Sequence, residues 1–462
     1  MLVMDRDGTV HARDDRFLPA ADALTASTGG DKLPATARPR ARVAAQATPS
    51  ALRALLDSGA IDQITYDDAS GTYAQARRLL AKTSGFRRVQ MSAVLGNLER
   101  MAAGGRLTAS RLPALMATLE RNVEWWSKGP LLSPGRRVSF AGSRIVWQHY
   151  ANQGIQIQWL ATWGKVNALF KDKLHDPEFR AAIDEALALA GQRAGGIAFE
   201  YLFPFDGGSP PWVSGLAQGT ALTALSRGAI RLEDNAYFEA ARSALGIFRT
   251  PPPEGVAQPT ATGTHYLQYS FTGLHILNGF VQALNGLHDF TVYANDEDGR
   301  ALFEAGEREL RAELPAYDTG GWSRYSPGQD SSVNYHQLLL DFLHDLCIRM
   351  RHSGEDGELY CAASDRFAAD LTTPPVVTLS TPGSPPRKRH LAAVAFEIDK
   401  PATVTVVVKR GKFFKRLAAR VGSGRHSFPW RPPRAGTYAL RVDAVDLKGN
   451  KASIDGTADV RP

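Results

Sequence analysis

The sequence predicts a mainly α-helical protein: an α/α toroid, built as an incomplete barrel of helical hairpins, followed by a small all-β sandwich. Two observations lead to this class. Apolar residues recur at three- and four-residue spacing in successive segments between residues 49 and 372, as on amphipathic helices. After proline-rich residues around 372–390, the pattern changes to alternating segments rich in Val, Thr and Tyr, which is typical of strands.

Length and composition set the domain count. The chain has 462 residues, of which 44% are apolar, so we expect two or three domains with a sizeable core. No run of 18 apolar residues occurs, and no transmembrane segment is predicted. The predicted parts are an irregular N-terminal arm at 1–48, a helical region at 49–130, the toroid domain at 131–372 and an Ig-like or fibronectin-like sandwich at 375–462.

The first residues contain one misleading motif. VMDRDGTV resembles the first motif of haloacid-dehalogenase-type phosphatases, in which Asp5 would be the nucleophile and Asp7 the general acid. Only four residues precede Asp5, and the Ala/Pro/Arg-rich segment that follows has no periodicity. We therefore interpret the motif as a polar terminus. The same residues lack the apolar segment of a signal peptide.

The helical part follows from residue 49. Gly, Ser, Thr and Asp separate about a dozen amphipathic segments, as helix capping predicts. Helices with short connections pack as antiparallel hairpins, and a long series of hairpins suits a toroid whose loops frame a concave face. One predicted helix starts near His149 and Tyr150 and contains Trp159 and Trp163, which we interpret as core residues. Cys347 and Cys361 could form a disulfide or remain as two buried thiols.

The C-terminal segment is basic. Residues 375–462 hold 17 Lys and Arg against 6 Asp and Glu, whereas the other residues hold 37 against 41 and the whole chain has a formal charge of +7. Such a segment is suited to an anionic polymer, although a charged face without a ligand is equally compatible with it. Nucleic acid is disfavoured because aromatic and basic residues do not interleave there. The basic residues that could hold an anionic glycan are Lys409, Arg410, Lys412, Lys415 and Arg416.

Three glycine-containing loops at predicted helix starts concentrate aromatic and polar residues. They span residues 199–219, 265–280 and 317–336. The last one, YDTGGWSRYSPGQDSSVNYH, carries three tyrosines, an arginine and a histidine. Neither a metal-ligand spacing nor a nucleophile–base pair is visible in it. The residues of interest are Trp212, Gln218, Gln268, Tyr269, Arg324, Tyr325, Asn334, Tyr335 and His336.

Taken in order, these loops resemble the C-terminal domain of heparosan D-glucuronyl C5-epimerases. PPWVSGLAQGTALTALSRG is similar to that family's Pro-Pro-Trp-Thr-Ser-Gly-Met-Ala-Gln-Gly helix. YLQYSFTGLHILNGFVQALNGLHD is similar to its Tyr-Glu-Glu-Tyr-Pro segment before a Leu-Asn-Gly-Phe helix. YDTGGWSRYS and NYHQL resemble its Tyr-Asp-x-Gly segment and Asp-Tyr-His. The resemblance covers about 150 residues and implies that Tyr269, Tyr325 and Tyr335 are the acid–base tyrosines.

C5 epimerisation explains why phenols are suited to the reaction. The proton on C5 of a uronate, next to the carboxylate, is removed by one group and returned to the opposite face by another. A tyrosine, whose ordinary pKa is near 10, can act as the base if a cation or hydrogen bonds favour its phenolate. Donors must also stabilise the charge that grows on the carboxylate. In principle neither metal nor cofactor is needed, and we predict none.

Three positions depart from the family pattern. Gln268 stands where the family has Glu, Asn334 where it has Asp, and Leu339 where it has a second His. These differences suit another uronate polymer, a weaker epimerase or a glycan-binding protein without catalysis. The rival enzyme class is a uronate polysaccharide lyase, which shares the first proton abstraction. A glycoside hydrolase would instead need two carboxylates at a fixed separation, for example among Asp206, Asp318 and Asp330.

The predicted partner is a uronate-containing polysaccharide. The resemblance also implies a homodimer. The expected location is secreted or at the cell surface, with a cytoplasmic location as the alternative.

Overall fold

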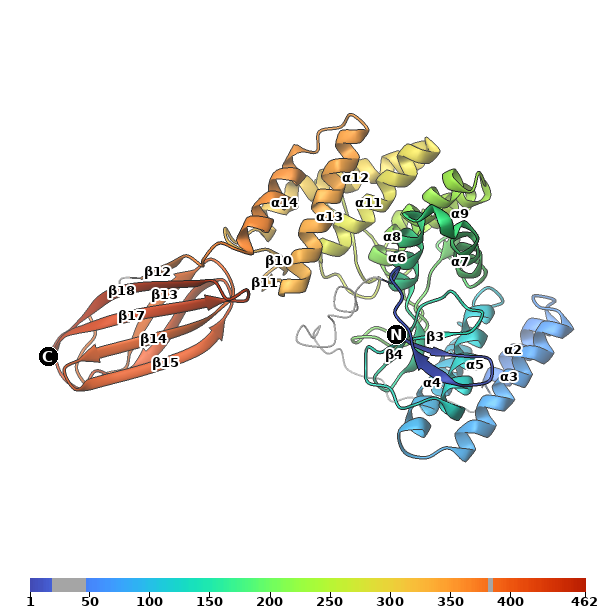
Figure 1. The fold of residues 1–462 in the computed structure, drawn as a ribbon, viewed down its shortest axis with the longest axis horizontal. Coiled ribbons are helices and arrows are strands. Elements are labelled where there is room, and N and C mark those ends of the chain that lie inside the picture. Colours follow the sequence, from blue (N-terminus) through green and yellow to red (C-terminus); the bar gives the residue numbers. More distant parts are fainter. Residues whose placement is uncertain (19–46, 381–384) are drawn as a thin grey trace. The chain divides into compact units, whose positions relative to one another are not determined.

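The computed structural model describes residues 1–18, 47–380 and 385–462 (Figure 1). The chain divides into two compact units. Unit 1 comprises Met1–Leu274 and Gln282–Glu309, and unit 2 comprises His275–Val281 and Leu310–Pro462. Most of the predicted N-terminal arm, residues 19–46, lies outside the described residues. Helices predominate, with small sheets between them and a β-rich C-terminal region, which confirms the prediction of a mainly α-helical chain with a β-rich C-terminal part.

The helices follow the segments of 3.6-residue periodicity. Asp62 caps α3 by accepting a hydrogen bond from the Thr65 amide (2.8 Å), as the punctuation predicts. The rings of Trp159 and Trp163 are fully buried, which confirms their interpretation as core. The helices are α2 (Ala47–Asp57), α3 (Gln63–Lys82), α4 (Gly85–Ala103), α5 (Leu112–Lys128), α6 (Trp159–Phe170), α7 (Asp176–Ala188), α8 (Gly215–Arg231), α9 (Ala236–Ala244), α10 (Gly246–Arg249), α11 (Leu277–Ala294), α12 (Glu297–Glu313), α13 (Val333–His352) and α14 (Glu358–Asp370), with short 3-10 turns at Lys173–His175 and Leu314–Tyr317.

A five-stranded sheet of order β2-β1-β3-β4-β5 lies in unit 1. The first strand pairs in parallel with β3, more than 130 residues later, and its Val3 and Met4 are buried. Part of the segment that was predicted as an irregular terminus therefore forms strands. They were not predicted because the partner strand β3 is distant in sequence. The helix predicted near His149 is also wrong, since a β4–β5 hairpin precedes α6. The strands are β1 (Leu2–Met4), β2 (Val10–Ala12), β3 (Arg137–Phe140), β4 (Trp147–Tyr150) and β5 (Gly154–Ile157).

Within unit 1, α8 and α11 approach each other backbone to backbone. A Cβ added at Gly286 would lie 2.0 Å from the carbonyl oxygen of Gly219, and one added at Gly219 would lie 2.6 Å from the Ala283 Cα. Only glycine permits such a distance.

Three short hairpins complete the loops between helices: β6 (Gly191–Arg193) with β7 (Gly196–Ala198), β8 (Ala257–Pro259) with β9 (Thr264–Tyr266), and β10 (Arg324–Ser326) with β11 (Gln329–Asp330).

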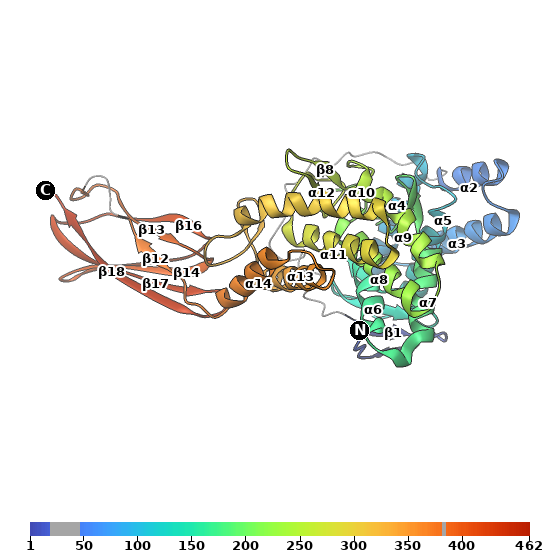
Figure 2. The same ribbon diagram turned by 90° about the horizontal axis from the view of Figure 1, so that it is seen from above.

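Unit 2 contains α13 and α14, joined by a disulfide between Cys347 and Cys361, and the β-rich region. Two sheets, of order β12-β13-β16 and β15-β14-β17-β18, make up this region (Figure 2). They share one hydrophobic core that includes Phe396, Val404 and Trp430. Residues 447–450 connect the last two strands. The strands are β12 (Val377–Leu379), β13 (Ala392–Ile398), β14 (Ala402–Arg410), β15 (Phe413–Val421), β16 (Gly424–Trp430), β17 (Gly436–Asp446) and β18 (Lys451–Val460).

A buried lysine links the end of α14 to these sheets. Lys400 is 1% exposed, and its ammonium donates hydrogen bonds to the carbonyls of Asp370 (2.8 Å) and Thr373 (2.7 Å). The Asp446 carboxylate lies 3.7 Å away. The charge is therefore compensated, as a buried ion requires. Of the helices that the structure describes, none has the length and apolarity needed to cross a membrane.

Candidate functional site

Tyr325 and Tyr335 lie together in unit 2. Tyr325 is in β10 and Tyr335 is in the first turn of α13; they are 7% and 9% exposed, and their ring centroids are 4.5 Å apart. A turn at Gly328 (φ +79°) connects β10 to β11, and Ser332 then caps α13 by accepting from the Tyr335 amide (3.3 Å). The glycine-rich loop thus brings two phenols into contact.

His336, next to Tyr335, is a structural residue. It is fully buried and stacks on Trp322 at 3.8 Å between ring centroids. Its Nε2 donates to the Phe367 carbonyl (2.8 Å), so Nδ1 accepts from the amide and hydroxyl of Ser323. Burial lowers the pKa of His336 to about 4. Both ring nitrogens are engaged, and the predicted substrate contact of His336 is therefore wrong.

Arg324 and Asn334 flank the tyrosine pair in sequence. The guanidinium of Arg324 is half-buried and donates to the Ala316 carbonyl (3.0 Å). A guanidinium has five N–H groups, so this hydrogen bond leaves donors for a carboxylate, and the predicted role of Arg324 stays a prediction. Asn334 is exposed in the first turn of α13, where its amide is accessible to a ligand.

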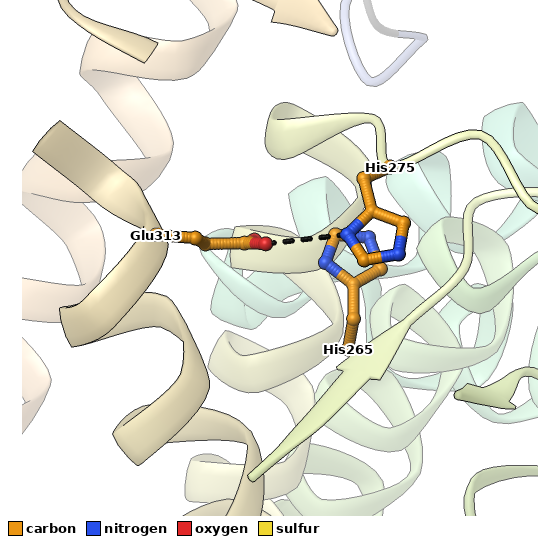
Figure 3. Close-up of side chains that lie close together, drawn as sticks. All are labelled: His265, His275 and Glu313. Atoms are coloured by element: carbon orange, nitrogen blue, oxygen red, sulfur yellow. Dashed lines mark hydrogen bonds and ion pairs between the residues drawn. The ribbon is translucent and has the colours of Figure 1, made fainter. Parts of the chain in front are cut away.

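A histidine–glutamate contact in unit 2 was not predicted from the sequence. His275, just before α11, places Nδ1 3.3 Å from a carboxylate oxygen of Glu313 at the end of α12 (Figure 3). The hydroxyl of Tyr317 donates to the His275 carbonyl (3.0 Å). Figure 3 also draws His265, which is buried in β9 of unit 1. His275 stands in one of the three loops of interest, but no local pattern connects it to a carboxylate 38 residues later.

Trp212, in unit 1, packs within an aromatic cluster. Its ring is 3% exposed and stacks on Tyr201 at 4.2 Å and on Phe205 at 5.5 Å. The indole nitrogen donates to the Phe203 carbonyl (2.9 Å). A ring covered in this way cannot stack on a sugar, so the predicted substrate role of Trp212 is wrong. Its edge contact with Tyr269, at 5.8 Å, instead fixes the position of that tyrosine.

Gln218 is also structural. It is 1% exposed in α8, and its Oε1 accepts from the Phe199 amide (3.3 Å). The Nε2 atom donates to the carbonyls of Ile197 (3.3 Å) and Ala244 (3.4 Å). The side-chain amide of Gln218 thus makes three hydrogen bonds, all to backbone groups. Gln218 therefore holds the loop before α8 in place and does not bind a substrate.

Tyr269 and Gln268 remain suited to contact a ligand. Tyr269 is half-buried and stacks on Phe271 at 5.4 Å. Gln268 is 4% exposed, and among the described residues its Oε1 has no hydrogen-bond partner. A buried acceptor without a partner is costly, and a sugar hydroxyl would satisfy it.

Tyr150 is a further phenol near Tyr269 that the sequence analysis did not select. Burial, followed by the charges of Tyr201 and Tyr269, raises the pKa of Tyr150. Its hydroxyl accepts from the Gln158 amide group (3.0 Å). It was missed because its segment was predicted to be helical, whereas β4 places it beside the aromatic cluster, at 4.6 Å from Phe203.

Comparisons with known proteins match the same part of the chain. Residues 194–353 match the family model for the D-glucuronyl C5-epimerase C-terminus. A D-glucuronyl C5-epimerase of Caenorhabditis elegans is 35% identical over 130 residues, which are 25% of this chain and 21% of that protein. An uncharacterized protein of Methanocaldococcus jannaschii is 26% identical over 147 residues, which are 30% of this chain and 48% of that protein. The aligned parts therefore span about a fifth and about half of these relatives.

A solved structure, the unsaturated glucuronyl hydrolase from Streptococcus agalactiae, aligns with 77% of this chain and 84% of its own chain at a TM-score of 0.31 and 11% identity.

The residues that match the family model include Tyr269, Tyr325 and Tyr335. Together, the family match and the epimerase relative support an epimerase-like carbohydrate protein.

Proposed function

We propose that this protein binds a uronate-containing polysaccharide and epimerises its uronate residues at C5, with tyrosines as the acid–base groups. One observation carries the proposal: Tyr325 and Tyr335 contact each other at 4.5 Å between ring centroids within the residues that match the epimerase family model. We further propose that the helices form an α/α toroid and that the β-rich region is an Ig-like accessory domain.

The reaction moves one proton. A tyrosinate takes the C5 proton, and the electron pair left on C5 delocalises into the neighbouring carboxylate. A phenol then gives a proton to the opposite face of C5, which inverts the centre without net loss of atoms. Such positioned acid–base groups typically accelerate proton transfer by about 10²- to 10⁴-fold each.

The local structure suits a negative phenol at Tyr335. The amino end of α13 carries a partial positive charge, which favours an anion in its first turn. Because the rings of Tyr325 and Tyr335 touch, no sugar can enter between them, and the pair serves one face of C5. The resemblance assigns an acid–base role to Tyr269 as well. Arg324 and Asn334 are proposed to bind the substrate, as is Gln268 through its buried Oε1 atom.

The departures at Gln268, Asn334 and Leu339 affect the choice of polymer and the efficiency. An amide at Gln268 can accept from or donate to a sugar hydroxyl but carries no charge. Heparosan is the first polymer to test because the resemblance points to it. A secreted or cell-surface location is part of the proposal, since a disulfide such as Cys347–Cys361 persists in oxidising compartments.

Product analysis tests this function. The full chain is incubated with heparosan, and the sugars are identified by NMR. We expect iduronate, formed from glucuronate. Unsaturated uronate ends with chain cleavage would instead identify a lyase, and binding without any product would identify a glycan-binding protein. Either result would overturn the epimerase proposal.

A further inference from the structure

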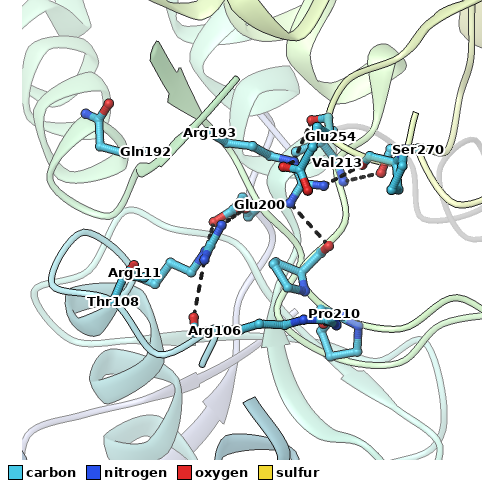
Figure 4. Close-up of polar contacts among 12 residues, drawn as sticks. Arg106, Thr108, Arg111, Gln192, Arg193, Glu200, Pro210, Val213, Glu254 and Ser270 are labelled. Atoms are coloured by element: carbon cyan, nitrogen blue, oxygen red, sulfur yellow. Dashed lines mark hydrogen bonds and ion pairs between the residues drawn. The ribbon is translucent and has the colours of Figure 1, made fainter. Parts of the chain in front are cut away.

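A pocket in unit 1 combines guanidinium groups (Figure 4) with the aromatic ring of Phe271. Its volume is about 330 Å³. The lining residues come from the α4–α5 connection, the β6 strand, the loop before α8 and the segment after Tyr269, and include Arg106, Arg111, Arg193, Ser209, Pro211 and Phe271. None of these residues was selected from the sequence.

Two of the arginines are fixed by one buried carboxylate. Arg111 donates to both oxygens of Glu200, at 2.6 and 2.9 Å, and Arg193 donates to Glu200 Oε1 at 2.9 Å. The Glu200 side chain is 1% exposed, and those of Arg111 and Arg193 are 12% and 3% exposed. Arg193 also donates to the carbonyls of Glu254 (2.6 Å) and Pro211 (3.3 Å). Such a network forms a rigid wall.

The charges at the pocket do not balance. Glu200 neutralises one of the three guanidiniums. Among the described residues that line the pocket, Glu254 has the only carboxylate, 3.7 Å from Arg193 Nε and 64% exposed, where solvent weakens its interaction. The pocket therefore retains a positive charge, and an anion that enters it gains charge-assisted hydrogen bonds.

Arg106 is the arginine suited to contact such an anion. Its side chain is exposed, and among the described residues it makes one hydrogen bond, to the Pro210 carbonyl (2.6 Å). Four of its five N–H groups remain for a ligand. A planar guanidinium pairs with a carboxylate or sulfate through two parallel hydrogen bonds.

Phe271 connects the pocket to the candidate site. Its ring lines the pocket, stacks on Tyr269 and meets the edge of Trp212 at 5.3 Å. Gly208 permits this position, because a Cβ there would lie 2.4 Å from Phe271 Cδ1. An aromatic ring beside a cationic group can hold the apolar face of a sugar while the cation binds its acid group.

We propose that this arginine pocket binds the acidic group, carboxylate or sulfate, of another sugar along the polysaccharide, near the uronate that reaches Tyr269. This inference rests on the proposed function and adds to it that the enzyme recognises at least two units of an acidic chain. Arg106 is a binding residue in this arrangement, and Arg111 and Arg193 position the pocket.

Calorimetric binding of heparosan hexasaccharide tests the inference. Arg106→Ala should weaken Kd by about tenfold, and Arg106→Gln, which keeps a donor but not the charge, should weaken it similarly. Arg78→Ala, at an exposed arginine of α3, is the control and should leave Kd unchanged. Carboxyl-reduced hexasaccharide should bind the wild type and Arg106→Ala equally weakly. N-sulfated hexasaccharide tells the two acid groups apart, because a larger effect of Arg106→Ala on it assigns the pocket to sulfate.

The outcomes separate this inference from the proposed function. Equal Kd values for wild type and both Arg106 variants would contradict the proposed binding of an acidic group in the pocket, even if iduronate forms. The same loss in Arg78→Ala would also overturn it, because it would indicate a diffuse charge effect. An Arg106-dependent Kd without any iduronate would support the pocket and contradict the epimerase proposal.

Discussion

At the residue scale, a Tyr-His pair resembles two functional side chains, but the structure engages His336 in contacts within the protein. Tyr335 contacts Tyr325, whereas His336 stacks on Trp322. The sequence shows that both residues begin a helix. It cannot show which of two adjacent side chains faces the interior, because that depends on α14, which supplies the Phe367 carbonyl.

The buried His336 predicts a pH dependence of stability. Its pKa is about 4 in the folded protein against an ordinary value of 6.5, so between these values the unfolded chain binds more protons. Its contribution is complete above pH 6.5 and is lost as the pH falls toward 4. The free energy of unfolding should therefore drop by about 3 kcal/mol over this range. Urea titrations at several pH values measure it.

Comparison with His336→Gln isolates this contribution, because glutamine keeps a donor for the Phe367 carbonyl and does not titrate. The comparison is needed because burial raises the pKa of Asp370 to about 6. That carboxyl acts in the opposite sense: its contribution is present below pH 3.8 and is lost as the pH rises through about 6. A difference between wild type and variant that does not change with pH would refute the role of His336.

At the element scale, the sequence predicts helices better than strands. Helix periodicity is local, and α2 to α5 appear where the apolar spacing places them. The pairing of β1 with β3 joins residues 2–4 to residues 138–140, and no local pattern contains that partner. The same holds for β4, whose segment was predicted to be helical, so that Tyr150 was not selected as a site residue. Long-range contacts also explain why the arginine pocket and the His275–Glu313 pair were not foreseen.

The contact of α8 with α11 gives a second stability prediction. Gly286→Ala would place a Cβ 2.0 Å from the Gly219 carbonyl oxygen, forcing the helices apart at a cost of about 3 kcal/mol. Gly71→Ala is the matched control in α3, because nothing lies within 4 Å of its Cβ position; it should stabilise the protein by about 1 kcal/mol. Chemical denaturation compares them, and equal effects of the two substitutions would contradict the close contact.

At the scale of the whole molecule, the helical periodicity and the change of pattern after the proline-rich residues predicted a helical part followed by a β-rich part. The family resemblance pointed to the three tyrosines. The structure then separated the predicted site residues that remain suited to a ligand from those that make contacts only within the protein. It placed Tyr325 with Tyr335, left Gln268 with an unsatisfied acceptor, and moved Trp212, Gln218 and His336 to structural roles. Burial decided these cases, because a buried side chain whose polar atoms are all bonded within the protein has none left for a ligand.

The central claim is that the Tyr325–Tyr335 pair transfers the C5 proton of a uronate. Its most direct test is the loss of the C5–H NMR signal of heparosan in D2O. The wild type and Tyr293→Phe, at an exposed tyrosine of α11, should exchange this proton for deuterium at equal rates. Tyr325→Phe and Tyr335→Phe should slow the exchange by roughly 100-fold or more. Exchange by both variants at the wild-type rate would contradict the claim.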